Sequence, residues 1–157
     1  MTAHFAASGK EVMNIIQEIK DAWGWIGIEP TEVVGENDFG NLMIENADGR
    51  YWRLCPEDVY CEVVANNRDE LDYLSADQEF LADWYMQALV DQAKEHLGAL
   101  GEGQKYCLVI PSVLGGEYAM INIKVAPLVE LIRLSGSVAR QIRDLPDGSQ
   151  IQLRIVD

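Results

Sequence analysis

Residues 42–64 read LMIENADGRYWRLCPEDVYCEVV, and this stretch predicts an antiparallel sheet of three strands. Two short β-prone runs, Leu42–Glu45 and Arg50–Leu54, flank the turn residues NADG at 46–49, which is typical of a hairpin. A third run, Val59–Val64, resumes the strand pattern after a short break. We therefore expect a three-stranded meander.

On the N-terminal side, the sequence predicts one helix over about Gly9–Trp23. Ser8 and Glu11 have the spacing of a capping box, and apolar residues recur behind them at helical spacing. Pro30 cannot continue a helix. Residues 1–38 are therefore expected to form a helix and a connector.

On the C-terminal side, a capping box at Ser75 and Gln78 predicts a second helix that ends at Gly98. One face of this helix is apolar: Phe80, Leu81, Trp84, Tyr85, Ala88 and Leu89. Met86 and Val90 fall on the opposite, polar face. Either another layer of the protein covers these two residues, or they belong to a partner interface.

The remaining sequence predicts two strands, a third helix and a last strand. The strands are Lys105–Ile110 and Tyr118–Val125, separated by a loop at 111–117, and the last strand is Gln150–Val156. Pro127 suits the first position of the third helix. Gly136 in the middle of that helix indicates close packing or a kink.

The expected order is α-βββ-α-ββ-α-β over a single α+β domain, residues 1–157. We expect three helices packed on a mixed or antiparallel sheet of about six strands.

Charge is concentrated in the middle of the chain. Ten acids and one base lie between Glu57 and Asp91, in a chain whose formal net charge is −14. Such a field repels nucleic acid and anionic membranes and speeds encounter with a basic partner. The alternative is a solvated face that keeps the protein soluble.

The residues that enzymes and metal sites need are sparse. The two histidines, His4 and His96, belong to no nucleophile–base set, and no P-loop or GxSxG motif occurs. Cys55, Cys61 and Cys107 lack metal-binding spacing. We expect no catalytic activity, no metal and no cofactor. A hydrolase or ligand site at the Leu114–Tyr118 loop stays open as the enzyme-class alternative.

An odd number of cysteines favours a reducing compartment. No secretory signal and no apolar run of spanning length is visible. We therefore expect a cytoplasmic protein without direct nucleic-acid or membrane binding.

Three segments carry a resemblance to a known family: GRYWRLCPEDVYC at 49–61, YCLVIPSVLGGEY at 106–118 and QIRDLPDGSQIQLRIV at 141–156. Together they resemble the C-terminal domain of bacterial immunity proteins encoded beside type VI secretion DNase effectors. The family-like region is residues 39–157, and the similarity itself extends from Phe39 to Val156. The string from Ile110 to Tyr118 and the turn from Asp144 to Gly148 are its most specific parts.

The resemblance implies a protein that binds a cognate effector toxin, a nuclease, and neutralises it. A nuclease cleft attracts phosphate, so an acidic surface suits such a target. We expect the partner-binding residues to be the acids of the central segment with two apolar anchors: Glu57, Asp58, Asp69, Glu70, Asp72, Glu79, Asp83, Met86 and Val90. The alternative is a regulatory or scaffold module of the same fold. Self-association stays open in either case.

Overall fold

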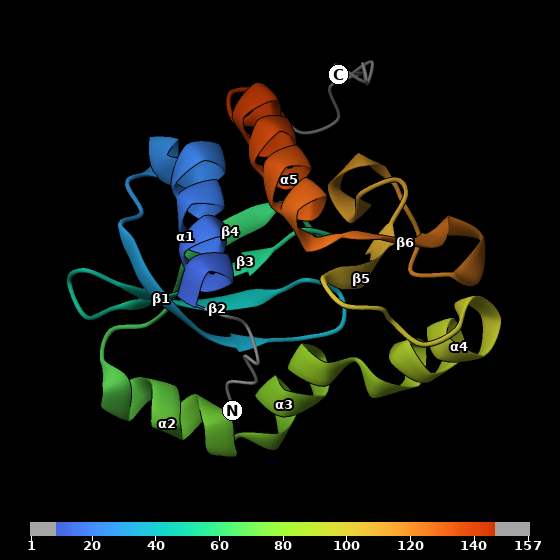
Figure 1. Ribbon diagram of the computed structural model, residues 1–157, viewed down its shortest axis with the longest axis horizontal. Coiled ribbons are helices and arrows are strands. Elements are labelled where there is room, and N and C mark those ends of the chain that lie inside the picture. The colour runs from blue at the N-terminus through green and yellow to red at the C-terminus, as the bar shows by residue number, and fades with distance from the viewer. Residues whose placement is uncertain (1–8, 147–157) are drawn as a thin grey trace.

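The computed structural model describes residues 9–146, with side chains described from Ile15 onward, and its strands form two antiparallel sheets (Figure 1). The first sheet has four strands that pair in chain order: β1 (Pro30–Glu36), β2 (Leu42–Asn46), β3 (Tyr51–Cys55) and β4 (Tyr60–Ala65). The second sheet pairs β5 (Gln104–Leu108) with β6 (Ile123–Pro127).

Helices cover both faces of the four-stranded sheet. Figure 1 shows α1 (Gly9–Trp23) and α5 (Leu128–Ile142) on one side of it. On the other side α2 (Arg68–Ala76) and α3 (Gln78–Tyr85) form a row that α4 (Gln87–Leu97) extends towards the second sheet. Three short 3-10 turns complete the fold: η1 (Gly24–Ile26), η2 (Ser112–Leu114) and η3 (Met120–Asn122).

The side chains of β2 alternate between two cores. Leu42 and Ile44 pack with Ile19 and Ile132 in the core beneath α1 and α5. Met43 packs on the other face with the fully buried Trp84 of α3. A sheet buried on both faces needs apolar residues at successive positions, and LMI at the start of β2 meets that need.

The contact between α1 and α5 depends on Gly136. A Cβ atom at this position would lie 2.4 Å from the carbonyl oxygen of Ala22. Only glycine permits the two helices to approach this closely, which confirms the expectation of close packing at Gly136. Arg133 of α5 and Glu18 of α1 add a bidentate ion pair across the same contact, with N–O distances of 2.7 and 2.6 Å.

Several predicted elements are confirmed, and others are corrected. The first helix, the hairpin and the helix after Pro127 occur as expected. The single helix over 75–98 is wrong, because Met86 has a left-handed backbone (φ 45°) that separates α3 from α4, and α2 precedes both. The six strands form two sheets rather than one, and β1 was not predicted.

The residue that caps the N-terminus of α3 also differs from the predicted one. Asp77 accepts a hydrogen bond from the Glu79 amide and is the N-cap, whereas Ser75 lies inside α2 and donates to the Leu71 carbonyl oxygen. The predicted cap Ser8, His4, the predicted last strand at 150–156 and the end of the predicted Asp144–Gly148 turn lie outside the described residues.

Another layer of the protein covers Val90 and partly covers Met86. Val90 is 3% exposed and packs with Phe39 and Tyr106, while Met86 is half-buried against the same cluster. The second sheet is that layer, so the first of the two alternatives for this pair is correct.

None of the described helices combines the length and the hydropathy that crossing a membrane requires.

Candidate functional site

The turn between β3 and β4 places two carboxylates at the junction of the two sheets. Pro56 to Val59 form a β-turn closed by a hydrogen bond from the Val59 amide to the Pro56 carbonyl oxygen (3.2 Å). Val59 has φ +55°, an unfavourable value for a β-branched residue. Its side chain is buried in the core beneath α1 and α5, and this packing holds the strained turn in place.

Glu57 is buried at 4% exposure and belongs to a polar chain that ends at the surface. Asn41 donates from Nδ2 to both Glu57 carboxylate oxygens, at 2.9 and 2.8 Å. The Asn41 oxygen accepts from Arg53 Nε (3.0 Å), and Arg53 pairs with Asp83 of α3 at 2.7 Å. The Arg53 guanidinium also lies 5.1 Å from the Trp84 ring centroid. This polar network ties the loop before β2, the turn after β3, β3 itself and α3 together.

Burial shifts the pKa of Glu57 within this polar network. It raises the pKa of Glu57 above its ordinary value of 4.5, and the hydrogen bonds from Asn41 offset only part of that rise. Asn41 stands between the Glu57 carboxylate and the Arg53 guanidinium. Arg53 therefore contacts the amide rather than the acid, and its charge is directed to Asp83.

Asp58 connects the turn to the segment between β5 and β6. Its carboxylate accepts hydrogen bonds from Ser112 Oγ and the Tyr118 hydroxyl. The Ser112 amide donates to the Glu57 carbonyl oxygen (2.9 Å). Burial and the neighbouring carboxylate raise the pKa of Tyr118, so the phenol stays a donor at neutral pH. The two sheets are thus joined by contacts between residues more than 50 positions apart in the chain.

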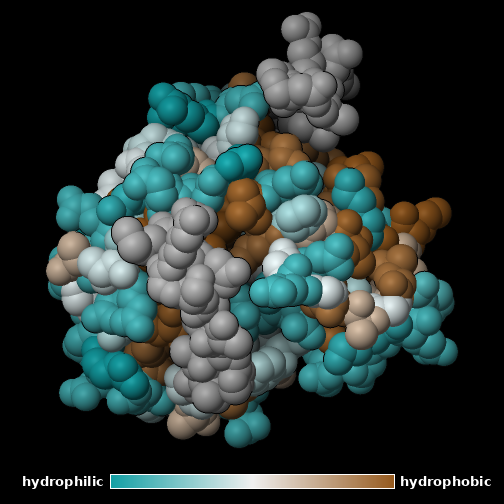
Figure 2. Space-filling view, viewed as in Figure 1, coloured by the Kyte–Doolittle hydropathy of each residue, from teal (hydrophilic) through white to brown (hydrophobic). Residues whose placement is uncertain are grey.

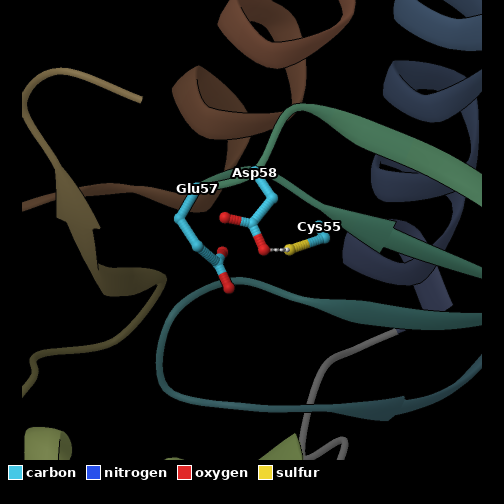
Figure 3. Close-up of side chains that lie close together, drawn as sticks. All are labelled: Cys55, Glu57 and Asp58. Atoms are coloured by element: carbon cyan, nitrogen blue, oxygen red, sulfur yellow. Dashed lines mark hydrogen bonds between the residues drawn. The ribbon is translucent and has the colours of Figure 1, made fainter. Parts of the chain in front are cut away.

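Cys55, Glu57 and Asp58 have ligand atoms within 4.8 Å of one another (Figure 3). Figure 3 shows the Asp58 carboxylate between the Cys55 sulfur and Glu57, with the thiol at 3.7 Å from Asp58 Oδ2. Protein donors already occupy both carboxylates, and burial raises the pKa of the Cys55 thiol, which disfavours the thiolate that a metal binds. The arrangement therefore fits a hydrogen-bonded clamp better than a metal centre.

The hydrogen bonds that Asp58 accepts hold a segment that exposes large apolar side chains. We call residues 109–121, between β5 and β6, the apolar loop; its exposed apolar members are Val109 (51%), Ile110 (46%), Val113 (51%), Tyr118 (42%) and Ile121 (92%). Figure 2 shows hydrophobic surface at the right of the molecule, where Figure 1 places this segment. The sequence identified the glycines and the turn here, but whether neighbouring elements cover these side chains is a property of the tertiary structure.

Most of the predicted acidic residues lie on the row of helices opposite α1 and α5. Helices α2 to α4, together with Asp77 between α2 and α3, carry eight exposed or half-buried carboxylates and two bases, Arg68 and Lys94. Arg68 pairs with Asp72 at 3.0 Å. Glu70 accepts a hydrogen bond from the Asn66 amide (2.9 Å) and so helps to begin α2. We call these helices with their carboxylates the acidic row.

The nine predicted partner-binding residues separate into three groups. Asp69, Glu70, Asp72, Glu79 and Asp83 are exposed on the acidic row, and Asp58 is half-buried beside the apolar loop. Met86 is half-buried at the break between α3 and α4. Glu57 and Val90 are core residues in this structure, which corrects their prediction as surface contacts. Glu57 is buried because Asn41 satisfies its carboxylate, and Val90 because the second sheet covers it.

Comparison with known proteins adds a family match and a structural neighbour. Residues 65–139, just under half of the chain, match the family model described as T6SS immunity protein Tdi1, C-terminal. The matched range includes the acidic row and the apolar loop. Over this range the chain is similar to immunity proteins of bacterial type VI secretion systems. No match is found among curated proteins.

The structural neighbour is the crystal structure of Atu4351 from Agrobacterium tumefaciens, with a TM-score of 0.53 and 14% sequence identity. The alignment covers 80% of this chain and 63% of that chain, so this chain spans less than two thirds of its neighbour's length. At this identity the similarity shows the shared α+β fold alone.

Proposed function

We propose that this chain is an immunity protein that binds a cognate type VI secretion effector, a nuclease, and blocks it through an acidic surface. The observation that carries the proposal is the family match over residues 65–139, the range that also holds the acidic row. The effector is the natural partner of such a protein, and the inhibitor acts by binding rather than by catalysis.

The charge of the chain suits this target. A nuclease presents a basic or metal-loaded cleft to the phosphates of its substrate. A surface with eight carboxylates and two bases on three successive helices and the cap residue Asp77 offers that cleft a substitute for nucleic acid. Long-range attraction between such surfaces speeds encounter, and salt weakens it. Because a nuclease toxin meets chromosomal DNA in the cytoplasm, we propose that the inhibitor acts there.

The test is binding to the purified cognate effector, which we expect a gene neighbouring that of this chain to encode. Asp69→Lys/Glu79→Lys reverses two exposed carboxylates of the acidic row without disturbing the hydrogen bonds of Asp77 or Glu70. We expect an affinity loss of about 10-fold or more at low salt, mainly through slower association. The loss should shrink as salt screens the charges.

The matched control is Glu29→Lys/Glu32→Lys, which reverses two exposed carboxylates near β1 and changes the net charge equally. We expect it to weaken binding by less than about 3-fold, since it acts only through the overall field. If the two double variants weaken binding equally, the acidic row is not the contact surface. If the wild-type protein neither binds the effector nor protects cells from it, the proposed function is wrong.

A further inference from the structure

We propose that the apolar loop is a preformed anchor for the effector, and that its exposed apolar side chains enter a shallow apolar pocket bordered by basic residues on that protein. This inference rests on the proposed function and adds to it a contact surface outside the acidic row. The observations that carry it are the rigid construction of the loop, its exposure and the charge of the chain.

Asn122 organises the loop from within the fold. Its side chain accepts from the Ile110 amide (2.9 Å) and donates to the carbonyl oxygens of Ile110 (3.0 Å) and Glu117 (2.9 Å). Its own carbonyl oxygen accepts from the Val109 amide (2.8 Å). Asn122 is buried at 8% exposure, so these bonds are shielded from water. One side chain thus closes both ends of the loop.

Backbone contacts fix the tip of the loop. The Gly116 amide donates to the Pro111 carbonyl oxygen (3.0 Å), and a Cβ atom at Gly116 would lie 1.7 Å from the Ile110 carbonyl oxygen. Gly115 has φ +92°, a conformation that favours glycine. From outside, Asp58 holds Ser112 and Tyr118. These contacts hold the loop in this conformation, which reduces the ordering that binding requires.

This rigid loop exposes apolar side chains where a soluble protein would gain from polar ones. Ile121 is 92% exposed, and Val109, Ile110 and Val113 are each about half exposed. Contiguous apolar surface on a water-soluble chain marks a contact site. Preorganisation makes such a site effective, because little conformational entropy is lost when a partner covers it. Exposure and preorganisation together favour a contact site for another protein.

The charge of this chain indicates which kind of partner covers the apolar loop. A second copy of this chain would bring together two molecules of formal net charge −14, which oppose association. Within the apolar loop the only residue charged at neutral pH is Glu117, an exposed acid, and the half-buried Asp58 lies beside the loop. A basic protein complements both this border and the acidic row. The effector proposed above has that charge.

The test compares loop variants with a matched control on the same purified pair of proteins. Val113→Ser/Ile121→Ser shortens two exposed side chains and should leave thermal unfolding unchanged. We expect affinity for the effector to fall by about 30-fold or more, mainly through faster dissociation. The dependence of the affinity on salt should stay that of the wild type, because no charge changes. Leu134→Ser, at a 59% exposed leucine of α5, should weaken binding by less than about 3-fold.

Each other outcome contradicts the inference. Wild-type-like affinity of the double variant, with the wild-type protein bound normally, overturns the anchor and leaves the proposed function standing. Absence of wild-type binding overturns both. A free protein that is a dimer until Ile121→Ser is introduced would assign the loop to a second copy. Reduced thermal stability of the loop variants with unchanged affinity would assign it to a segment of this chain. Ile121→Ser alone repeats the affinity test if the double variant folds poorly.

Discussion

At the scale of single residues, Glu57 and Asp58 are neighbouring acids with opposite surroundings. Glu57 is enclosed in the core and contacts an amide, while Asp58 is half-buried and contacts two hydroxyl groups from the apolar loop. Sequence alone identifies both as acids in a charged stretch. Their different surroundings arise from Asn41 and Tyr118, which are distant in the chain, so residue spacing could not separate a structural carboxylate from a surface one.

Glu57 gives a prediction for the pH dependence of stability. Burial raises its folded pKa above the ordinary 4.5, so the native state binds the proton more tightly than the unfolded state. Its stabilising contribution is fully present below about pH 4.5 and is lost as the pH rises through the folded pKa. We expect Glu57→Gln to gain free energy of unfolding relative to the wild type between about pH 4 and about pH 7, measured by urea unfolding.

Glu62→Gln, at an exposed acid of β4, is the control for this measurement. The free energy of unfolding of this control should stay within about 0.5 kcal/mol of the wild-type value over the same pH range. A Glu57→Gln difference that is constant, or that falls as the pH rises, would contradict the assigned direction of the pKa.

At the scale of elements, the α1–α5 contact is set by one glycine. Alanine in a helix interior is normally about 1 kcal/mol more stable than glycine. Because a Cβ at Gly136 would meet the Ala22 carbonyl oxygen at 2.4 Å, we expect Gly136→Ala to lower the free energy of unfolding by about 1–3 kcal/mol instead. Gly24→Ala, where a Cβ meets nothing within 4 Å, should change it by less than about 0.5 kcal/mol. Chemical denaturation that shows equal effects would argue against the close contact.

The start of α3 tests the corrected cap. Asp77→Ala removes the acceptor for the Glu79 amide and should cost about 1 kcal/mol of unfolding free energy. Ser75→Ala should cost less, since its hydroxyl bonds a carbonyl oxygen that α2 already uses. Thermal or urea unfolding measures both. A larger loss for Ser75→Ala would restore the helix start that the sequence predicted.

The sequence predicted those elements whose own residues carry a recognisable local pattern. The hairpin, the first helix and the helix after Pro127 have turn residues, regular spacing or a proline at the right position. The strand β1 was missed because it begins at Pro30 and contains register shifts between Pro30 and Glu32 and between Val33 and Gly35, which break alternation. The division of α3 from α4 depends on the left-handed backbone of Met86, for which the sequence gives no warning.

At the scale of the whole molecule, the proposed function rests on the distribution of carboxylates. The sequence predicted the acidic stretch, and the structure brings five of its nine predicted contacts to exposed positions on α2 and α3. The sequence predicted a loop at 111–117 and left a hydrolase or ligand site at Leu114–Tyr118 open, but it did not predict the exposed apolar surface, because exposure depends on which elements pack nearby. The polar chain from Asp83 through Arg53 and Asn41 to Glu57 reaches the turn whose next residue, Asp58, holds the loop.

The central claim is that the effector docks on the acidic row and the apolar loop together. Hydrogen exchange of backbone amides, compared between the free protein and its complex with the effector, tests this claim most directly. We expect slower exchange in residues 68–85 and 109–121 on binding, with residues 15–36 of α1 and β1 unchanged. Protection confined to α1 and β1, with residues 68–85 and 109–121 exchanging as in the free protein, would contradict it.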